Sequence, residues 1–286
     1  MALHPLLADA AVRWEHLDVP GGPLAVLRQE PTAEVRRGTV LLVPGYTGSK
    51  EDFRLLLPPL AEAGHPVVAL DQRGQFQSPG PDDLAAYSTD ALGTDLLAAV
   101  DALGCGPMHV VGHSFGGLVA RAALLSRPGV FRSLTLMGSG PAGLTGPRVE
   151  ILSLLRPLLL QGGTPALVAA MDAMNAQDAR FLALDASLQG FLRDRMLAAS
   201  PHALMGMADA LTSEPDRVEE LRGSGVPLLV LHGAADDAWT PALQEQMAKR
   251  LGAAYAVIPH AQHSPAVENA VATAEVLLRF YGAEDA

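Results

Sequence analysis

Short apolar runs alternate with helical patterns along most of the chain, and this alternation constrains the fold more than any other feature. The runs are four or five residues long and almost free of polar side chains, which is typical of strands buried on both faces of a parallel sheet. They lie at 39–43, 67–70, 108–111, 133–137, 228–231 and 255–258, after a predicted hairpin at 12–19 and 24–28. Helical patterns fall between them at 51–63, 89–103, 115–126, 241–251 and 265–281. The alternation predicts an α/β fold with a mostly parallel sheet flanked by helices.

One long stretch interrupts this rhythm. From Pro141 to Arg222 no strand pattern occurs, and leucine, alanine and methionine recur at helical spacing. We therefore predict a core domain made of residues 1–140 and 223–286, with residues 141–222 forming a helical cap inserted into it. An insertion at the carboxyl ends of the strands would lie above the crevice where open α/β sheets bind ligands.

Charge argues against nucleic acid and membranes as partners. The formal net charge is −11, the isoelectric point is about 5.2, and the chain has two lysines, Lys50 and Lys249. A nucleic-acid binder needs a basic surface, and an anionic membrane attracts basic residues. With 49% hydrophobic residues the chain can bury a substantial core, so we expect a soluble globular protein.

Three further features bear on the compartment. The single cysteine, Cys105, excludes an intrachain disulfide and is expected to be inert. Residues 1–9 lack a basic region followed by a long apolar stretch, so no signal peptide is expected. The most membrane-like segment, 151–160, is half the length of a span and contains Arg156 and Pro157. We predict a cytoplasmic location.

The sequence Gly-His-Ser-Phe-Gly at 112–116 is the central chemical signal. It follows a predicted strand and precedes a predicted helix, which is the context of a serine nucleophile on a sharp turn. Gly112 and Gly116 leave room for that turn, since a side chain at either position would clash with it. We predict that Ser114 is the nucleophile.

A serine needs a base to accept its proton, and His263 is our candidate. It follows the last predicted strand, and Ser264-Pro265 then begins the final helix, which places it at the carboxyl edge of the sheet. His260, three residues upstream, is the competitor. No carboxylate or third histidine lies close to these two in sequence, so no metal site is predicted.

The base in turn needs an acid that fixes its tautomer. After the penultimate strand the chain carries Asp236 and Asp237, of which we prefer Asp236 and keep Asp237 as the alternative acid. The other aspartate would then cap the following helix.

The oxyanion hole requires two backbone N–H groups. One would belong to Phe115, which follows the nucleophile, and the other to Tyr46 in the Pro-Gly-Tyr loop after the strand at 39–43.

Taken together, these motifs resemble the α/β-hydrolase fold family from residue 39 to the C-terminus. The matching pieces are Pro44-Gly45-Tyr46, Asp71-Gln-Arg73-Gly74, Gly-His-Ser114-Phe-Gly-Gly, His-Gly-Ala-Ala-Asp236 and His263-Ser-Pro. The resemblance implies an eight-stranded sheet, a cap domain and the chain order nucleophile, acid, histidine. Two positions depart from the family pattern: many members have His-Gly where this chain has Pro44-Gly45, and Phe76 stands where relatives usually have a glycine. We interpret Asp71 and Arg73 as structural.

These observations predict a serine hydrolase that cleaves a small, largely apolar ester, thioester or lactone through an acyl-enzyme. Ser114 argues against the haloalkane dehalogenase and epoxide hydrolase branches, which resemble this fold but use an aspartate at that position. Alternatives are a carbon–carbon bond hydrolase or a perhydrolase on the same triad, and a ligand-binding protein with little turnover. No metal or organic cofactor is expected. The expected partner is a small-molecule substrate, and a homo-oligomer is possible.

Overall fold

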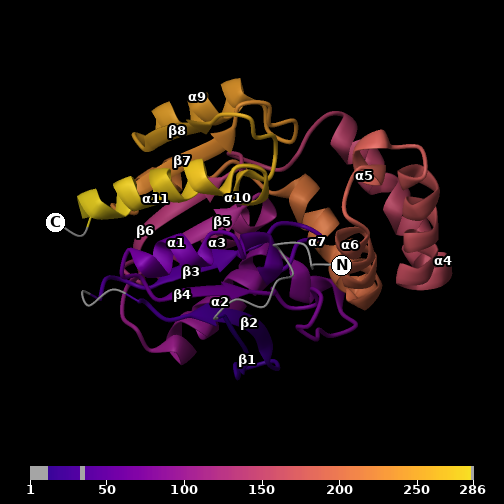
Figure 1. The fold of residues 1–286 in the computed structure, drawn as a ribbon, viewed down its shortest axis with the longest axis horizontal. Helices are drawn as coiled ribbons and strands as arrows, with labels where there is room; N and C mark the ends of the chain where they lie inside the picture. Colours follow the sequence, from indigo (N-terminus) through magenta and orange to yellow (C-terminus); the bar gives the residue numbers. More distant parts are fainter. Residues whose placement is uncertain (1–11, 33–35, 285–286) are drawn as a thin grey trace.

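A computed structural model of the protein describes residues 12–32 and 36–284, so the predictions for residues 1–9 lie outside the described residues. Within the described ranges, one eight-stranded sheet has the order β1-β2-β4-β3-β5-β6-β7-β8 (Figure 1). Its strands are β1 Arg13–Leu17, β2 Leu24–Gln29, β3 Val40–Val43, β4 Val67–Leu70, β5 Met108–His113, β6 Phe131–Met137, β7 Leu228–Gly233 and β8 Ala254–Ile258. β2 pairs antiparallel with β1 and β4, and the pairs from β4 to β8 are parallel. The predicted α/β class and mostly parallel sheet are confirmed.

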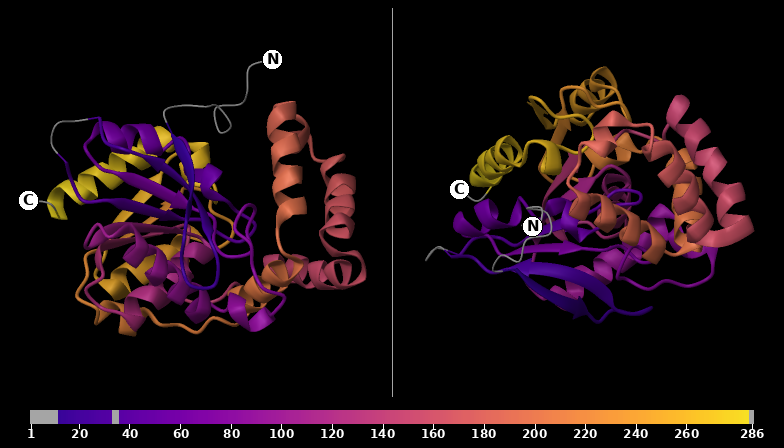
Figure 2. Two further views of the ribbon diagram at one scale, coloured as in Figure 1. Left: turned by 90° about the horizontal axis from the view of Figure 1, so that it is seen from below. Right: turned by 45° about the vertical axis from the view of Figure 1, so that its right-hand side comes forward.

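Helices cover both faces of the sheet (Figures 1 and 2). On one face lie α2 Thr89–Leu103, α3 Phe115–Ser126 and α9 Pro241–Leu251, and on the other lie α1 Leu57–Glu62 and α11 Ala270–Glu284. Strand β3 shows why two core layers form. Leu41 and Val43 pack into the layer under α2 and α3, whereas Val40 and Leu42 pack into the layer under α1 and α11. Successive side chains of a strand point to opposite faces, so a continuous apolar run serves both layers.

Three predicted helices, α2, α3 and α9, have the bounds that the sequence indicated, and two others are divided. The pattern at 51–63 becomes a 3-10 turn, η1 Lys50–Phe53, followed by α1, which carries two prolines in its first turn. The pattern at 265–281 becomes α10 Pro265–Glu268 and α11, which are separated at Asn269. A second 3-10 turn, η2 Leu84–Tyr87, precedes α2.

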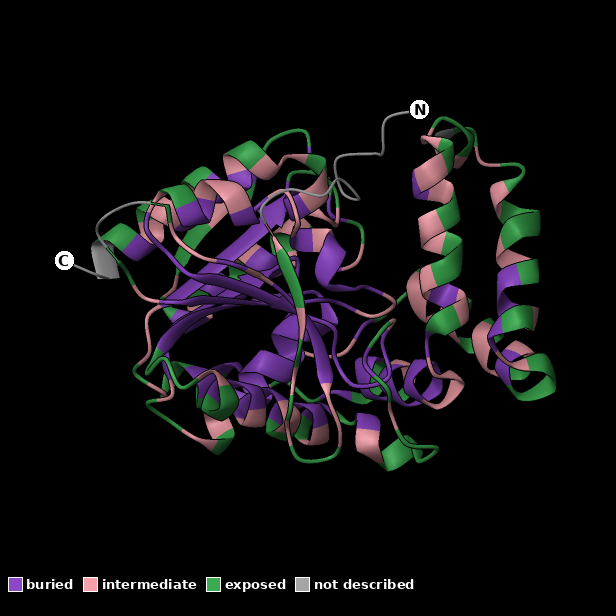
Figure 3. Ribbon diagram, turned by 60° about the horizontal axis from the view of Figure 1, so that its bottom comes forward, coloured by how far each residue is buried: buried purple, intermediate pink, exposed green. Residues whose placement is uncertain are grey.

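Between β6 and β7 the chain is helical. It forms α4 Pro147–Asn175, α5 Ala179–Leu182, α6 Ala186–Ala198, α7 Pro201–Ser213 and α8 Val218–Arg222. In Figure 2, α4 and α6 stand beside the sheet and α7 lies between them and the core. Figure 3 shows the inner strands of the sheet buried, while the edge strands β1 and β8 and helices α4 and α6 of the insertion are more exposed. The division into a core domain and a separate cap stays a prediction.

Helix α4 is the one helix in the described ranges that is long and apolar enough to cross a membrane, by length and composition alone. Its continuity is interrupted, however, because Gly162 and Gly163 have non-helical backbone angles and divide it into two shorter segments. Pro157 removes one backbone donor from the helical ladder of the first segment, and Pro165 lies in the first turn of the second. Neither segment approaches the roughly 20 residues of a membrane-spanning helix.

A buried arginine ties the helix behind Ser114 to both ends of the insertion. Arg121 on α3 is 1% exposed, and its guanidinium donates to the carbonyls of Pro141 (2.5 Å) and Pro215 (3.2 Å). It also pairs with the Glu214 carboxylate at 2.9 Å, whose second oxygen accepts from the Thr89 hydroxyl at 2.7 Å. The points where the insertion leaves and rejoins the core are therefore fixed to one side chain.

Replacing this arginine is expected to destabilise the fold strongly. Arg121→Leu leaves the Glu214 carboxylate buried without its cation, which costs about 3–5 kcal/mol of unfolding free energy. Urea unfolding at neutral pH measures the loss. Arg127→Leu on the same helix, where the arginine pairs with Asp101 at the surface, is the matched control and should remain close to wild type. Equal losses in the two variants would contradict the role of Arg121.

Candidate active site

Ser114 stands on a strained turn between β5 and α3. Its backbone has φ 54° and ψ −122°, a region that residues with a side chain rarely adopt. The turn requires the two flanking glycines. A Cβ on Gly112 would lie 2.5 Å from the Gly116 carbonyl oxygen, and a Cβ on Gly116 would lie 2.5 Å from the Pro44 carbonyl oxygen. The turn that carries Ser114 thus packs directly against the end of β3.

The structure brings Ser114, His263 and Asp236 together at the carboxyl edge of the sheet. They follow β5, β8 and β7, respectively, three strands that run in the same direction. The His263 Nε2 atom lies 3.0 Å from Ser114 Oγ, and its Nδ1 atom lies 3.0 Å from Asp236 Oδ1. A carboxylate only accepts hydrogen bonds, so Nδ1 carries the proton and Nε2 accepts from the serine hydroxyl.

The environment of Asp236 keeps its carboxyl ionised. Burial raises its pKa, but hydrogen bonds from His263, the Ala238 backbone N–H and Gln244 outweigh that effect, so the pKa lies below its usual value. The Ala238 N–H donates to Oδ1 and the Gln244 amide donates to Oδ2, each at 2.9 Å. Gln244 on α9 is fully buried and also donates to the Trp239 carbonyl at 2.7 Å. The carboxylate is therefore held from both sides.

The two competing residues lie elsewhere. The Asp237 side chain is 66% exposed and pairs with Arg148 at the start of α4. The helix cap that we expected from the second aspartate comes instead from Thr240, whose hydroxyl accepts from the Leu243 N–H. His260 is exposed, with a backbone φ of 58°.

Two buried glutamines hold the loop that carries Tyr46. The Gln72 amide donates to the Pro44 carbonyl and the Gln75 amide donates to the Gly45 carbonyl, both at 2.7 Å. Peptide groups are planar and trans, so fixing the Gly45 carbonyl turns the Tyr46 N–H toward the opposite side. Gly45 itself abuts the nucleophile, because a Cβ there would lie 2.9 Å from Ser114 Cβ.

The N–H groups of Tyr46 and Phe115 have no backbone acceptor among the described residues. The Tyr46 hydroxyl donates to the Leu204 carbonyl on α7 at 3.0 Å, so its side chain lies against the insertion. Burial raises the pKa of this hydroxyl, with a smaller contribution from the charge of Asp209. The Phe115 side chain is fully buried in the core.

His113, directly before the nucleophile, holds the backbone of His263. Its Nε2 donates to the His263 carbonyl at 2.7 Å, and the two rings lie 5.1 Å apart. Burial, with a smaller contribution from His263, lowers the pKa of His113 to about 4, so the ring is neutral at neutral pH. This contact joins the nucleophile strand directly to the loop of the base.

The loop after β4 is structural, in agreement with the sequence interpretation. Arg73 pairs with Asp95 and donates to the carbonyls of Pro20 and Gly21 in the hairpin turn. Asp71 accepts from the buried Lys50 ammonium at 2.8 Å. In the described ranges, no three histidine, cysteine or acidic side chains converge as metal ligands would.

Comparison with known proteins decides the family. A model of the alpha/beta hydrolase fold matches residues 38–270, which is most of the chain. The chain belongs to the α/β-hydrolase fold family. The sequence-based family prediction is confirmed.

Relatives of this α/β hydrolase have diverse names. It is 39% identical over 100 residues to a putative carbamate hydrolase of Variovorax paradoxus, covering 35% of this chain and 37% of the relative. It is 30% identical over 209 residues to epoxide hydrolase B of Mycobacterium tuberculosis, covering 68% of this chain and 57% of the relative. These alignments thus span little more than a third and about half of the relatives' lengths.

Among solved structures, the enol-lactonase of Burkholderia xenovorans superimposes with a TM-score of 0.78 at 21% identity. The match covers 94% of this chain and 100% of the lactonase. At this identity the likeness shows the shared fold.

Sequence reasoning missed Gln72, Gln75, Gln244 and His113. Gln72, Gln75 and His113 lie within or beside the motifs, whereas Gln244 lies eight residues after Asp236 in α9. All four are buried, although glutamine and histidine are commonly found at surfaces. Polar residues flanking a loop or strand end were the available signal. Only the folded structure shows which carbonyl or carboxylate each one contacts.

The buried His113 is expected to make stability depend on pH. His113 binds its proton more weakly in the folded protein than in the unfolded chain. The free energy of unfolding is therefore expected to fall by up to about 3 kcal/mol as the pH falls from about 6.5 toward about 4. His113→Gln, which keeps an amide donor but does not titrate, should lose less between pH 7 and pH 4.5 in urea unfolding. Asp71 contributes equally in both proteins and cancels in the difference. His16→Gln, at an exposed histidine, is the control and should keep the wild-type pH dependence; identical pH dependence in His113→Gln and wild type would refute the effect.

Proposed function

We propose that this α/β hydrolase cleaves a small, largely apolar carboxylic ester, thioester or lactone through an acyl-enzyme on Ser114. The observation that carries the proposal is the pair of 3.0 Å contacts that link Ser114 Oγ, His263 and Asp236. A serine hydroxyl becomes a competent nucleophile when a positioned base takes its proton as it attacks.

The reaction then follows from the geometry. Ser114 Oγ attacks the substrate carbonyl while its proton passes to His263 Nε2, and Asp236 stabilises the imidazolium. The tetrahedral oxyanion accepts hydrogen bonds from the N–H groups of Tyr46 and Phe115, whose orientation is set in advance by Gln75 and by helix α3. His263 returns the proton to the leaving alcohol or thiol, and a water molecule activated by the same histidine cleaves the acyl-enzyme.

Carbonyl chemistry fits this nucleophile better than epoxide chemistry. Attack by a serine hydroxyl on an epoxide would leave an ether, which the triad has no means of hydrolysing, whereas attack on an ester leaves another ester. The activity named for epoxide hydrolase B therefore does not transfer to this chain. The names enol-lactonase and carbamate hydrolase both denote attack at a carbonyl carbon, which supports the same class.

The expectations on partners and location remain predictions. They comprise a small-molecule substrate, no binding to nucleic acid or membranes, a possible homo-oligomer and a cytoplasmic location. Carbon–carbon bond hydrolysis, perhydrolysis and simple ligand binding also stay open as predictions, and the experiments below separate the binding protein from the enzymes.

An activated serine is expected to react with a fluorophosphonate probe. Intact mass should show one adduct per chain in wild type and none in Ser114→Ala, with p-nitrophenyl ester turnover reduced by roughly 10⁴-fold or more. Ser139→Ala, at a buried serine on the neighbouring loop, is the matched control and should still be labelled. Absence of labelling in folded wild-type protein would favour the ligand-binding protein.

The acid is expected to be Asp236. Asp236→Asn should lower kcat by about 10⁴-fold, because the amide no longer holds the reactive tautomer of His263, as in the corresponding substitution of a serine protease. Asp237→Asn removes only an exposed pair with Arg148 and should retain most activity. Steady-state kinetics on one ester decide between them: loss of turnover in Asp237→Asn alone would reverse the assignment.

A further inference from the structure

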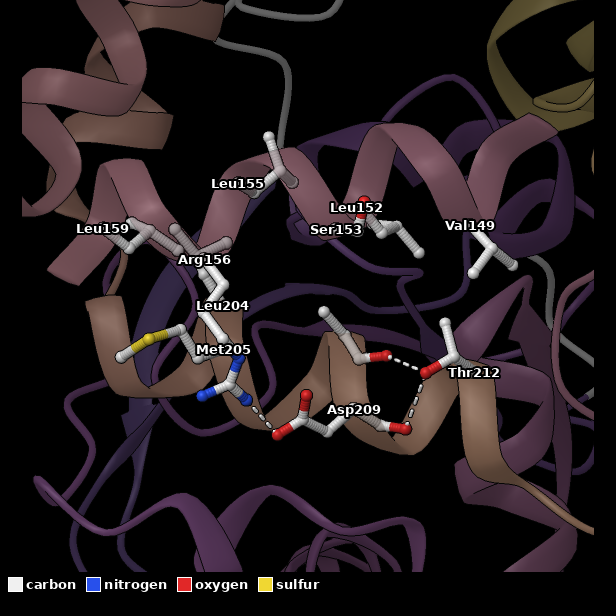
Figure 4. Close-up of a pocket in the computed structure, with 11 residues that line it drawn as sticks. Val149, Leu152, Ser153, Leu155, Arg156, Leu159, Leu204, Met205, Asp209 and Thr212 are labelled. Atoms are coloured by element: carbon white, nitrogen blue, oxygen red, sulfur yellow. Dashed lines mark hydrogen bonds and ion pairs between the residues drawn. The ribbon is translucent and has the colours of Figure 1, made fainter.

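A cavity of about 240 Å³ lies within the insertion, between the first half of α4 and helix α7 (Figure 4). Its walls carry apolar side chains from both helices, among them Leu152, Leu155, Leu159 and Met205. Figure 4 shows Val149 and Leu152 on the side of α4 that faces α7. None of the three triad residues lines it.

The polar side chains that line the cavity are already engaged. The Thr212 hydroxyl donates to carbonyls of its own helix, and the Ser153 hydroxyl donates to the Glu150 carbonyl. The two charged groups, Arg156 and Asp209, pair with each other, and their side chains are 40% and 56% exposed, so they mark the side open to solvent. Away from this open side the lining is mainly apolar, so the interior of the cavity offers a ligand mostly apolar contact.

Leu204 borders both this cavity and the oxyanion loop. Leu204, which is 2% exposed, lines the cavity and also a second, nearly filled crevice of about 10 Å³. Thr47 and Gly48, the residues after Tyr46, form the other wall of that crevice. The Leu204 carbonyl accepts from the Tyr46 hydroxyl, and the Tyr46 ring packs against the apolar cluster of Leu159, Leu204 and Met205. The residue whose N–H would bind the oxyanion thus contacts the cavity wall through its side chain.

We propose that this cavity receives the alkyl end of the substrate's acyl chain, and that Leu204 is the residue that limits access to it. The inference rests on the proposed function and narrows its substrate class to esters of medium-chain fatty acids. The crevice beside Thr47, at about 10 Å³, has no room for a ring system, and a narrow chain would have to displace the Leu204 side chain to reach the cavity. Each methylene that reaches the cavity is expected to raise kcat/KM by about fourfold.

Three variants test the role of the cavity. For each one, kcat/KM is measured with p-nitrophenyl acetate, butyrate and octanoate. Ala208→Phe fills the cavity from α7 and should lower the octanoate-to-butyrate ratio of kcat/KM at least tenfold. Leu204→Ala opens the partition and should raise that ratio. Ala173→Phe makes the same substitution at an exposed position on α4 outside the cavity and should leave the ratio at its wild-type value.

A binding measurement separates this inference from the proposed function. Isothermal titration calorimetry with sodium octanoate on the full chain should show binding that Ala208→Phe weakens at least tenfold and Ala173→Phe does not. That result in a protein without esterase activity would support the cavity as a binding site for an alkyl chain and would refute the proposed function. Ester turnover with an unchanged chain-length ratio and unchanged octanoate binding in Ala208→Phe would overturn the cavity assignment.

Discussion

The close approach of backbone to backbone around Ser114 is the contact on which the rest of the site depends. Gly112 meets the first turn of α3, Gly116 meets the end of β3, and Gly45 meets Ser114 itself, each at a distance that excludes a Cβ. These contacts hold the serine at a positive φ, which an isolated turn would not keep because the conformation is strained. They also bring the oxyanion loop and the helix N-terminus to one point. A substitution that loosened one of these contacts would displace the nucleophile and its hydrogen-bond donors together.

Buried polar residues around this contact fix the orientation of the groups that surround Ser114. Gln75 fixes a peptide plane, Gln244 fixes a carboxylate, and His113 fixes the backbone of His263. Each is a neutral donor to an acceptor within the fold, so each also stabilises the fold. Neutral donors suit this position, since an additional buried charge beside His263 would alter the equilibrium of the proton that the histidine has to move.

The sequence predicted those parts of the molecule that depend on local pattern. The inner strands of the parallel sheet can be recognised because both of their faces are buried and they are therefore largely apolar, whereas the edge strand β8 exposes Tyr255 and Val257. The ends of α2, α3 and α9 are marked by capping residues or by the end of the preceding strand. The positions of Ser114, Asp236 and His263 follow from the same pattern, since residues after parallel strands share one edge of the sheet. The sequence alone does not distinguish Asp236 from Asp237, because adjacent aspartates differ only in the direction in which their side chains point. Direction is set by Gln244 and the Ala238 N–H, which lie further along the chain. Gln72 and Gln75 donate to carbonyls that lie 28 and 30 residues away in the chain. At that separation the sequence pattern does not indicate which groups come into contact.

The insertion is where sequence is least informative and where relatives with a common core can diverge in substrate. Its helices are apolar on more than one side, so periodicity does not show which side faces the core. Ile151, Leu154 and Leu160 are exposed, while Leu152, Leu155 and Leu159 line the cavity. Its two ends are nevertheless fixed, because Arg121 binds the carbonyls of Pro141 and Pro215 from the helix that begins at the nucleophile. The helices between those points can therefore differ in length and angle without displacing Ser114. Anchoring the insertion to the helix behind Ser114 therefore lets the helices of the insertion vary while the positions of Ser114, Asp236 and His263 stay fixed.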